Sequence, residues 1–158
     1  EDRCDALYFV TDELRVNDIR ADVLLLGKKD DVLFPVFIEL KAKRDLDRLL
    51  EQLSNIVRDV SGDPETLAAF EEFVVAATGV SGRFDFERRI EMIIWPAPSD
   101  PGRVQKETKR KLKGRDVLEF FSYHQETDIP RMSLYFVRPV YTDQNEGSGP
   151  GTTRPHAN

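Results

Sequence analysis

The sequence predicts a single α/β domain in which helices flank a central mixed β-sheet. Two apolar runs of strand length lie on either side of a short charged turn that contains Gly27, which is the pattern of a β-hairpin. A strongly amphipathic helix follows this hairpin, and another strand-length run follows a second helix. The hairpin makes antiparallel neighbours, whereas a strand that returns after a helical crossover makes parallel ones. The predicted sheet is therefore mixed.

Length and composition limit the class of protein. The chain has 158 residues, of which 40% are hydrophobic and 33% are charged, as in soluble globular domains. No apolar run approaches the roughly 18 residues that cross a bilayer. A single cysteine, Cys4, cannot form an internal disulfide, which favours a reducing compartment such as the cytoplasm. The net charge of -6 gives no general basic field, so binding of a nucleic acid would require a local patch of basic residues.

The two ends of the chain differ from its middle. The first residues, 1–4, are neither a signal peptide nor an initiator methionine, so we expect a fragment that lacks an N-terminal helix. We expect residues 1–142 to form the domain. Residues 143–158 are rich in Gly, Ser, Pro and Thr without a hydrophobic pattern, which predicts a disordered tail.

The residues before the helices are predicted to form strands. Ahead of the hairpin, a strand, a turn and a short return strand are expected at residues 6–10, 11–13 and 14–16. In the hairpin, Asp22 heads the first strand. The second strand is expected to begin near Val36, because Pro35 cannot donate a hydrogen bond to a neighbouring strand.

Two helices follow the hairpin. The first has apolar residues at steps of three and four, namely Leu46, Leu49, Leu50, Leu53, Ile56, Val57 and Val60. Asp45 is its expected N-cap and Gly62 its expected end. The second helix is expected to start at Asp63 and Pro64 and to end at Gly79.

The remaining elements alternate between strands and one basic helix. After a loop at 80–88, strands are expected at 90–95, 117–123 and 134–140. The helix lies before Gly114 and is rich in cations, namely Arg103, Lys106, Lys109, Arg110, Lys111 and Lys113, with Arg115 just beyond it. Lys43 and this helix are candidates for holding a phosphate backbone, and the alternative is a solvated helix face.

Three charged residues stand out in the apolar hairpin. Asp22 lies at the head of its first strand, and Glu39 and Lys41 lie at the end of its second. Strand side chains alternate, so Glu39 and Lys41 share one face. Burial of these charges is costly unless they pair or hold a cation. Two converging carboxylates form a hard-oxygen site for Mg²⁺ or Mn²⁺, and the Leu40 carbonyl is a candidate third oxygen. Lys41 is a candidate for positioning or deprotonating a water molecule.

This arrangement resembles the PD-(D/E)xK nuclease superfamily, which includes restriction endonucleases, RecB-type nucleases and archaeal junction resolvases. The resemblance rests on Asp22, sixteen intervening residues and Glu39-Leu40-Lys41 before an amphipathic helix, and it covers about residues 19–123. It implies a restriction-endonuclease-like core and Mg²⁺- or Mn²⁺-dependent hydrolysis of DNA phosphodiester bonds, with Asp22 and Glu39 as metal ligands. Gln52, eleven residues past Lys41, matches a glutamine of RecB-like members and is implied to assist catalysis.

The sequence departs from the family pattern in two ways. Ala21 stands where the motif has proline, and no helix with a further acidic residue precedes the first strand. Asp12 and Glu13 are acidic, but they fall in the predicted turn and are not expected to be ligands.

Two other interpretations stay open. In the first, the chain is a catalytically silent nuclease-like module that binds nucleic acid or a protein partner within a longer chain. In the second, it is an unrelated α/β domain. In the second case the three charges form an ordinary ion network, with carboxylates too far apart to share a cation. A homodimer is compatible with each interpretation.

Overall fold

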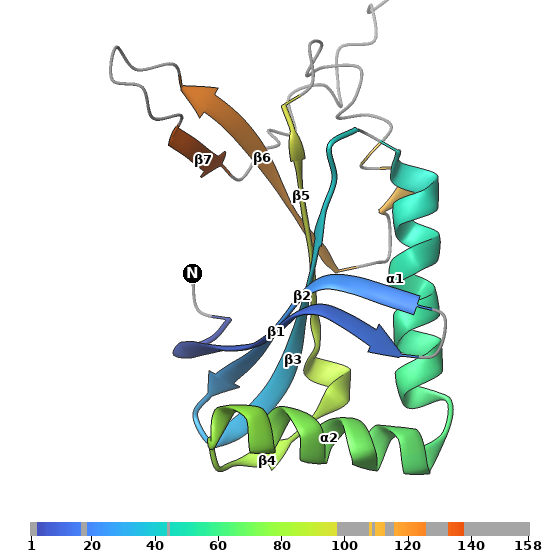
Figure 1. Cartoon of the computed structure of the whole chain (residues 1–158), viewed down its shortest axis with the longest axis vertical. Helices are drawn as coiled ribbons and strands as arrows, with labels where there is room; N and C mark the ends of the chain where they lie inside the picture. The colour runs from blue at the N-terminus through green and yellow to red at the C-terminus, as the bar shows by residue number, and fades with distance from the viewer. Residues whose placement is uncertain are drawn as a thin grey trace, which may run out of the picture.

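The structure is a computed structural model that describes residues 3–16, 19–43, 45–97, 108, 110–112, 116–125 and 133–137. The predicted α/β class is confirmed: a mixed sheet packs against helices (Figure 1). The helices are α1 (Leu46–Ser61), α2 (Pro64–Thr78) and the short 3-10 helix η1 (Phe86–Arg88). The strands are β1 (Ala6–Val16), β2 (Ile19–Lys29), β3 (Val32–Leu40), β4 (Arg83–Phe84), β5 (Ile90–Pro96), β6 (Val117–Gln125) and β7 (Ser133–Val137).

The sheet has the strand order β1-β2-β3-β5-β6-β7, with β4 also paired to β3. Strands β1, β2 and β3 are antiparallel neighbours. After the two helices the chain returns to β5, which is parallel to both β3 and β6. The hairpin and the parallel return strand were both predicted from the sequence, because each rests on local patterns of apolar residues and turns.

The predicted turn at residues 11–13 is wrong. Strand β1 runs without a break from Ala6 to Val16 and pairs with β2 along its length. Its register shifts between Phe9 and Thr11, as at a β-bulge. The polar residues that indicated a turn are therefore accommodated within a continuous strand.

The predicted start of the second hairpin strand is also wrong. Pro35 lies inside β3, opposite Leu26 of β2. On its other side β3 pairs with β4 at Val32 and Leu33, and with β5 from Val36 onward. Pro35 falls between these two pairings, so neither β4 nor β5 requires a backbone donor at this position.

Gly27 is part of β2 rather than of the turn. The turn between β2 and β3 lies at Asp30 and Asp31, and Asp30 has a positive φ of 54°, as tight hairpin turns require. Gly27 pairs with Phe34 of β3, and a Cβ atom on Gly27 would overlap the Phe34 ring. Glycine is therefore needed here for close packing.

Replacing Gly27 by alanine should lower the free energy of unfolding by about 1–3 kcal/mol, because the added methyl group meets the buried Phe34 ring. Urea unfolding measures the loss. The cost of Gly27→Ala should be smaller in a Phe34→Leu background, where the ring is gone. An equal cost in both backgrounds would show that Phe34 is not the cause.

Both predicted helices begin and end where the capping pattern indicates. The Asp45 side chain accepts a hydrogen bond from the Arg48 N–H at 3.2 Å, and Gly62 is the C-cap of α1. The Asp63 side chain accepts from the Thr66 N–H at 2.8 Å, and Gly79 ends α2. Among the described residues, no helix is long and apolar enough to cross a membrane.

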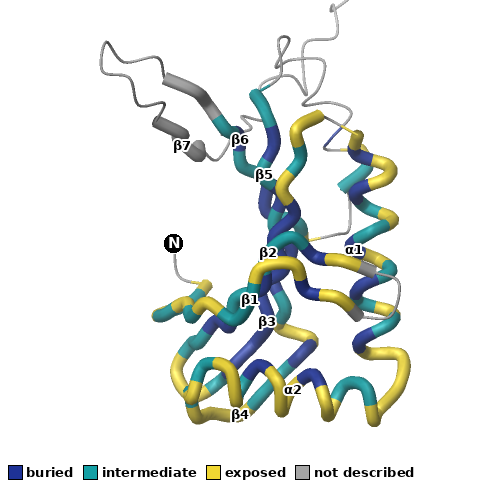
Figure 2. The backbone as a smooth tube through the Cα atoms, in the orientation of Figure 1, coloured by how far each residue is buried: buried dark blue, intermediate teal, exposed yellow. Residues whose placement is uncertain are grey.

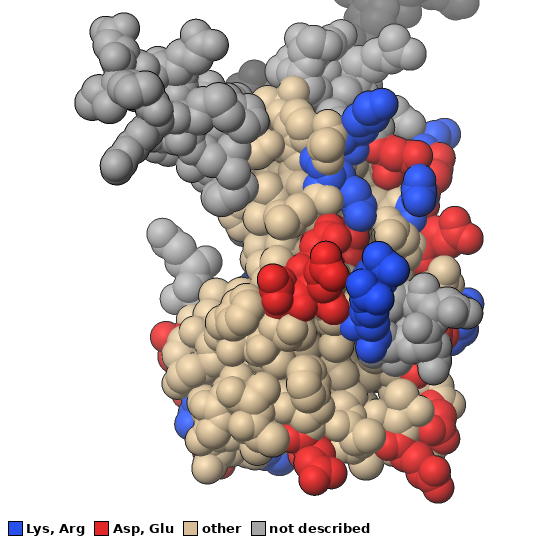
Figure 3. All heavy atoms as spheres, viewed as in Figure 1, with Lys and Arg blue, Asp and Glu red and all other residues tan. Residues whose placement is uncertain are grey.

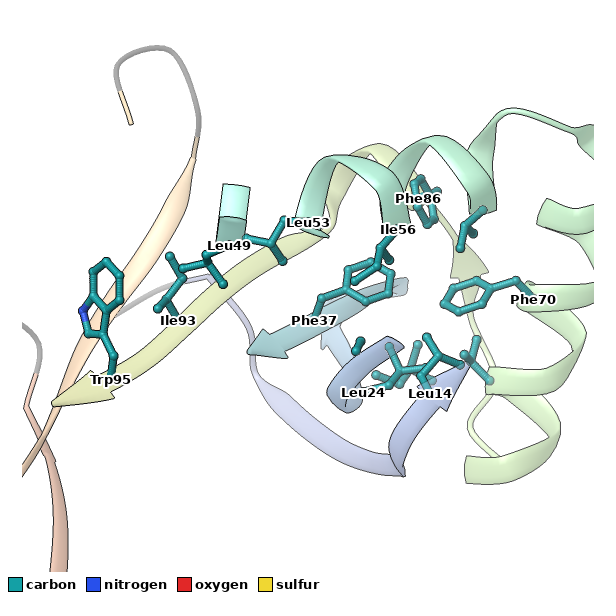
Figure 4. Close-up of a cluster of buried hydrophobic side chains, with 14 of the residues drawn as sticks. Leu14, Leu24, Phe37, Leu49, Leu53, Ile56, Phe70, Phe86, Ile93 and Trp95 are labelled. Carbon is teal, nitrogen blue, oxygen red and sulfur yellow. The ribbon is translucent and has the colours of Figure 1, made fainter. Parts of the chain in front are cut away.

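The hydrophobic core lies between the helices and one face of the sheet (Figures 2 and 4). Phe37 of β3 packs against Phe70 of α2, with ring centroids 6.0 Å apart. Leu49, Leu53 and Ile56 of α1 are buried in the same cluster. A second cluster on the other face contains strand residues and Cys4. The face covered by α1 is also the face that carries the candidate site.

Several predictions for the second half of the chain are refined. The expected loop at 80–88 contains β4 and η1, both too short to leave a periodic pattern. Strands β5, β6 and β7 confirm the strands expected at 90–95, 117–123 and 134–140, with shifted bounds. Of the basic helix only residues 108 and 110–112 are described, with a helical hydrogen bond from the Leu112 N–H to the Thr108 carbonyl. The tail at 143–158 lies outside the described residues.

Candidate metal and catalytic site

The β2–β3 hairpin brings Asp22 and Glu39 to the same place. Val23 pairs with Ile38, so the next position along the two strands sets Asp22 opposite Glu39. Two residues from them, Leu24 and Phe37 also form a pair, and both belong to the core cluster beneath α1. Strand side chains alternate, so Asp22 and Glu39 share that face.

Lys41 joins the two carboxylates. Its Nζ donates a hydrogen bond to Glu39 Oε2 at 2.6 Å and lies 3.7 Å from Asp22 Oδ2. The two carboxylate oxygens are therefore separated by no more than the sum of these two distances. The structure brings these three predicted residues together on one side of the sheet.

Backbone hydrogen bonds hold the end of β3 beside this cluster. The Leu40 N–H donates to Asp22 Oδ2 at 2.7 Å, and the Lys41 N–H donates to the Ile94 carbonyl of β5 at 2.9 Å. Asp22 thus supports the strand end as well as facing Lys41. Leu40 itself is exposed at the last position of β3, between Glu39 and Lys41 in the chain.

Glu39 is the most deeply buried of the three side chains. Its side chain is 1% exposed, compared with 24% for Lys41 and 38% for Asp22. Burial raises the pKa of the Glu39 carboxyl above its ordinary value, and the Asp22 charge raises it further, while Lys41 opposes both effects. The other oxygen, Glu39 Oε1, is buried without a hydrogen-bond partner. A buried ionised carboxylate with one unpartnered oxygen is energetically costly, and a bound cation would lower this cost.

Gln52 lies on α1, between residues that pack against the sheet. It is half-buried, and its Oε1 atom is buried without a hydrogen-bond partner, as Glu39 Oε1 is. Its neighbours on the helix, Leu49 and Leu53, face the core (Figure 4). The structure thus places a second unsatisfied acceptor on the helix that covers the face carrying Glu39.

The donor set suits a small hard cation. Among the described residues, no three His, Cys, Asp or Glu side chains gather in one place. Asp22 and Glu39 offer two carboxylates, and Lys41 lies between them. Mg²⁺ is commonly held by one or two carboxylates while it keeps several waters. The unpartnered Glu39 Oε1 fits such an ion, so the residues present are compatible with Mg²⁺ or Mn²⁺.

The predicted DNA contacts are only partly described. Lys43 and Arg110 are exposed. Lys106, Lys109 and Lys113 lie outside the described residues. In the space-filling view, acidic side chains gather where β1 and β2 cross the middle of the molecule, and basic ones lie directly beside them (Figure 3). Positive charge is thus available next to the acidic patch.

Comparisons with family models, curated proteins and solved structures found no match for this chain.

Two buried acidic residues in the sheet, Glu91 of β5 and Glu119 of β6, were not singled out from the sequence. Glu119 of β6 is buried and accepts a hydrogen bond from Trp95 Nε1 at 2.8 Å. Trp95 is itself a buried core residue. The signal for Glu119 was a lone acid within an apolar strand, the same signal that pointed to Glu39.

A large cavity among the described residues lies away from this cluster. Its volume is about 910 Å³, and it contains none of the four predicted catalytic residues. Its lining includes Phe34 and Ile90, toward the start of β3 and β5, whereas Glu39 lies at the end of β3. The candidate site is a partly open cluster and not this cavity.

Proposed function

We propose that this chain is a divalent-metal-dependent nuclease that hydrolyses DNA phosphodiester bonds. One observation carries the proposal: a buried Glu39 carboxylate, with one oxygen lacking a partner, lies beside Asp22 and Lys41 at the end of a central strand. The strand order supports it, because an antiparallel β1–β2–β3 unit, two helices and a parallel β5 suit the restriction-endonuclease-like core that the motif implies.

The three charged residues have distinct proposed roles. Asp22 and Glu39 would hold Mg²⁺ or Mn²⁺, with the Leu40 carbonyl as a further oxygen. A bound ion of this kind lowers the pKa of its water and neutralises charge on a phosphoryl group. The Lys41 ammonium, partly exposed between the two carboxylates, is placed to orient the attacking water or to hold a phosphate oxygen.

Residues around the cluster would bind and orient the DNA. Gln52 has an unpartnered buried oxygen that can accept a hydrogen bond from an ordered water. Exposed cations would hold the phosphate backbone, and the proposed ones are Lys43, Lys106, Lys109, Arg110 and Lys113.

Asp22→Asn should remove metal binding and slow Mg²⁺-dependent DNA cleavage by about 100-fold or more, because one of two carboxylate ligands is lost. Asparagine retains an oxygen that can accept the Leu40 N–H, so the fold should survive. Calorimetric titration with MgCl₂ and MnCl₂ measures binding, and cleavage of single- and double-stranded DNA measures activity. Asp31→Asn, in the exposed β2–β3 turn, is the matched control.

A catalytically silent nuclease-like module is the second candidate. It is favoured by the 2.6 Å contact of Lys41 with Glu39, which satisfies one carboxylate oxygen without any cation. The calorimetric titration separates the two candidates. A silent module gives no metal-binding heat that depends on Asp22, and its DNA affinity is unchanged by Asp22→Asn.

A further inference from the structure

The cavity of about 910 Å³ lies toward the start of β3 and β5, away from Glu39 at the end of β3. Its walls come from segments that are far apart in the sequence, among them Arg58 of α1, Arg88 of η1 and Asp116 directly before β6 (Figure 1). Cavities of about 300–1,000 Å³ have the size that holds small-molecule ligands. This one is therefore large enough for a small molecule.

The lining of the cavity is positively charged, although the chain as a whole has a net charge of -6. Six of the lining side chains are cations and three are acids. The cations are Arg3, Lys29, Arg58, Arg88, Arg89 and Lys111. The acids are Glu87, Glu91 and Asp116. A surplus of positive charge in a concave site attracts an anion and disfavours a metal ion.

Some of these cations connect the walls of the cavity to one another. Arg3 donates two hydrogen bonds to the Asp116 carboxylate, at 2.5 and 3.0 Å. Lys111 Nζ donates to Asp47 of α1 at 2.8 Å. Each contact links segments that are distant in the sequence, so these side chains shape the cavity and are not the first candidates for binding a ligand.

Arg58 and Arg88 are the cations best placed to bind a ligand. Their side chains are 69% and 52% exposed. Each makes its ion pair through Nε, Arg58 with Asp59 at 3.2 Å and Arg88 with Asp85 at 3.9 Å. Within the described part of the chain, no partner contacts the terminal nitrogens of either guanidinium. Guanidinium groups of this kind form paired hydrogen bonds with phosphate oxygens.

The cavity also has an apolar part. Phe34 and Ile90 are buried and line it, and the half-buried Val57 lines it from α1. The buried acid of the lining, Glu91, is contacted by Arg89 Nε at 3.5 Å, which offsets its charge. Apolar walls with a few charged groups are typical of sites that orient a ligand by its polar end.

We infer that this cavity binds a small molecule that carries phosphate groups on an apolar body, such as a nucleotide. Arg58 and Arg88 hold its phosphates, and the apolar lining holds its body. The inference does not rest on the proposed function, because it uses neither the metal cluster nor the residues proposed to bind DNA.

Calorimetric titration of the whole chain with ATP tests the inference, in EDTA so that no divalent metal takes part. Arg58→Met and Arg88→Met should each weaken ATP binding by about tenfold or more, because each removes charge-assisted hydrogen bonds to phosphate. Arg48→Met is the control on α1, where Arg48 is exposed outside the cavity. Arg83→Met is the control for Arg88, because Arg83 contacts the same Asp85 and does not line the cavity. Both controls should bind ATP as the wild type does.

Sodium pyrophosphate and adenosine test the two parts of the ligand separately. Each should bind more weakly than ATP, and only pyrophosphate binding should weaken in Arg58→Met and Arg88→Met. Adenosine that binds as tightly as ATP would overturn the role of the arginines. Pyrophosphate that binds as tightly as ATP would overturn the role of the apolar lining.

The remaining outcomes are equally definite. Both arginines are exposed, so the variants should fold, and equal melting temperatures without ligand check this. ATP should raise the melting temperature of the wild type and of the two controls more than that of Arg58→Met or Arg88→Met. Absence of ATP binding to the wild type at millimolar concentration overturns the inference, as does equal weakening in all four variants. If Arg58→Met and Arg88→Met weaken binding of a single-stranded DNA oligonucleotide as much as that of ATP, the cavity is part of a DNA-binding surface and the inference is also overturned.

Discussion

Glu39→Gln should abolish Mg²⁺-dependent DNA cleavage and, at neutral pH without metal, unfold at a higher temperature than the wild type. The gain follows because an ionised carboxylate with an unpartnered oxygen is buried in the wild type, and glutamine removes that charge while keeping the shape. Single stabilising substitutions commonly raise the free energy of unfolding by about 0.5–2 kcal/mol, and a gain in this range is expected here. Thermal unfolding in the presence of a chelator measures the gain.

The pH dependence of this difference has a definite sign. The pKa of Glu39 is raised in the folded protein, so the folded state binds a proton more tightly than the unfolded chain does. The stability that this proton contributes is present at low pH and is lost as the pH rises through the raised pKa. Urea unfolding over a pH series should therefore show the wild type losing stability, relative to Glu39→Gln, above the ordinary range of a glutamate.

Glu51→Gln is the control for this experiment, since Glu51 is exposed on α1. It should follow the wild-type pH profile. Saturating Mg²⁺ should reverse the order of the two melting temperatures, because it stabilises the wild type and not Glu39→Gln. Parallel profiles for the wild type and Glu39→Gln would mean that Glu39 carries no unfavourable charge in the folded protein.

Lys41→Met should slow single-turnover cleavage by at least about 100-fold while leaving metal binding intact. The proposed role of Lys41 is at the water or the phosphate, and groups that handle a proton in the reaction typically contribute about 10²–10⁴-fold. Methionine keeps much of the length of the side chain but removes the ammonium that contacts Glu39 at 2.6 Å. Metal affinity should be equal to or higher than that of the wild type, because the cation no longer competes with this ammonium.

Lys43→Met provides the matched control for Lys41→Met. Lys43 is exposed two residues further along the chain, so its loss should weaken DNA binding and reduce its salt dependence without a comparable effect on single-turnover cleavage. Unchanged cleavage by Lys41→Met would remove Lys41 from the mechanism. Simultaneous loss of metal binding would instead show that Lys41 is needed to shape the site.

The elements predicted well from the sequence are those with strong local signals. Asp45 and Asp63 cap α1 and α2 as predicted, because an N-cap needs only a side chain within the first turn. The proximity of Asp22 and Glu39 could also be predicted from the sequence, because a hairpin sets the register of its two strands.

Other features depend on groups that are distant in the sequence. Pro35 is tolerated because β4 and β5, which come after the helices, leave a gap beside it. Strand β1 continues through Asp12 because β2 pairs with it. The burial of the Glu39 side chain likewise depends on the packing of α1 over the sheet. A pattern of residues along one strand does not predict this packing. These are the points at which the sequence-based prediction erred or was silent.

The indole of Trp95 gives the chain a built-in optical probe. Trp95 is the one tryptophan of the chain and is buried, with its Nε1–H donated to Glu119. Leu40 pairs with Ile94, so Trp95 follows next to the strand end that carries Lys41. The tryptophan fluorescence of the folded protein therefore originates at one location, a single residue beyond the backbone contact between Lys41 and Ile94. Its emission reports on the loosening of that corner of the sheet without any attached dye.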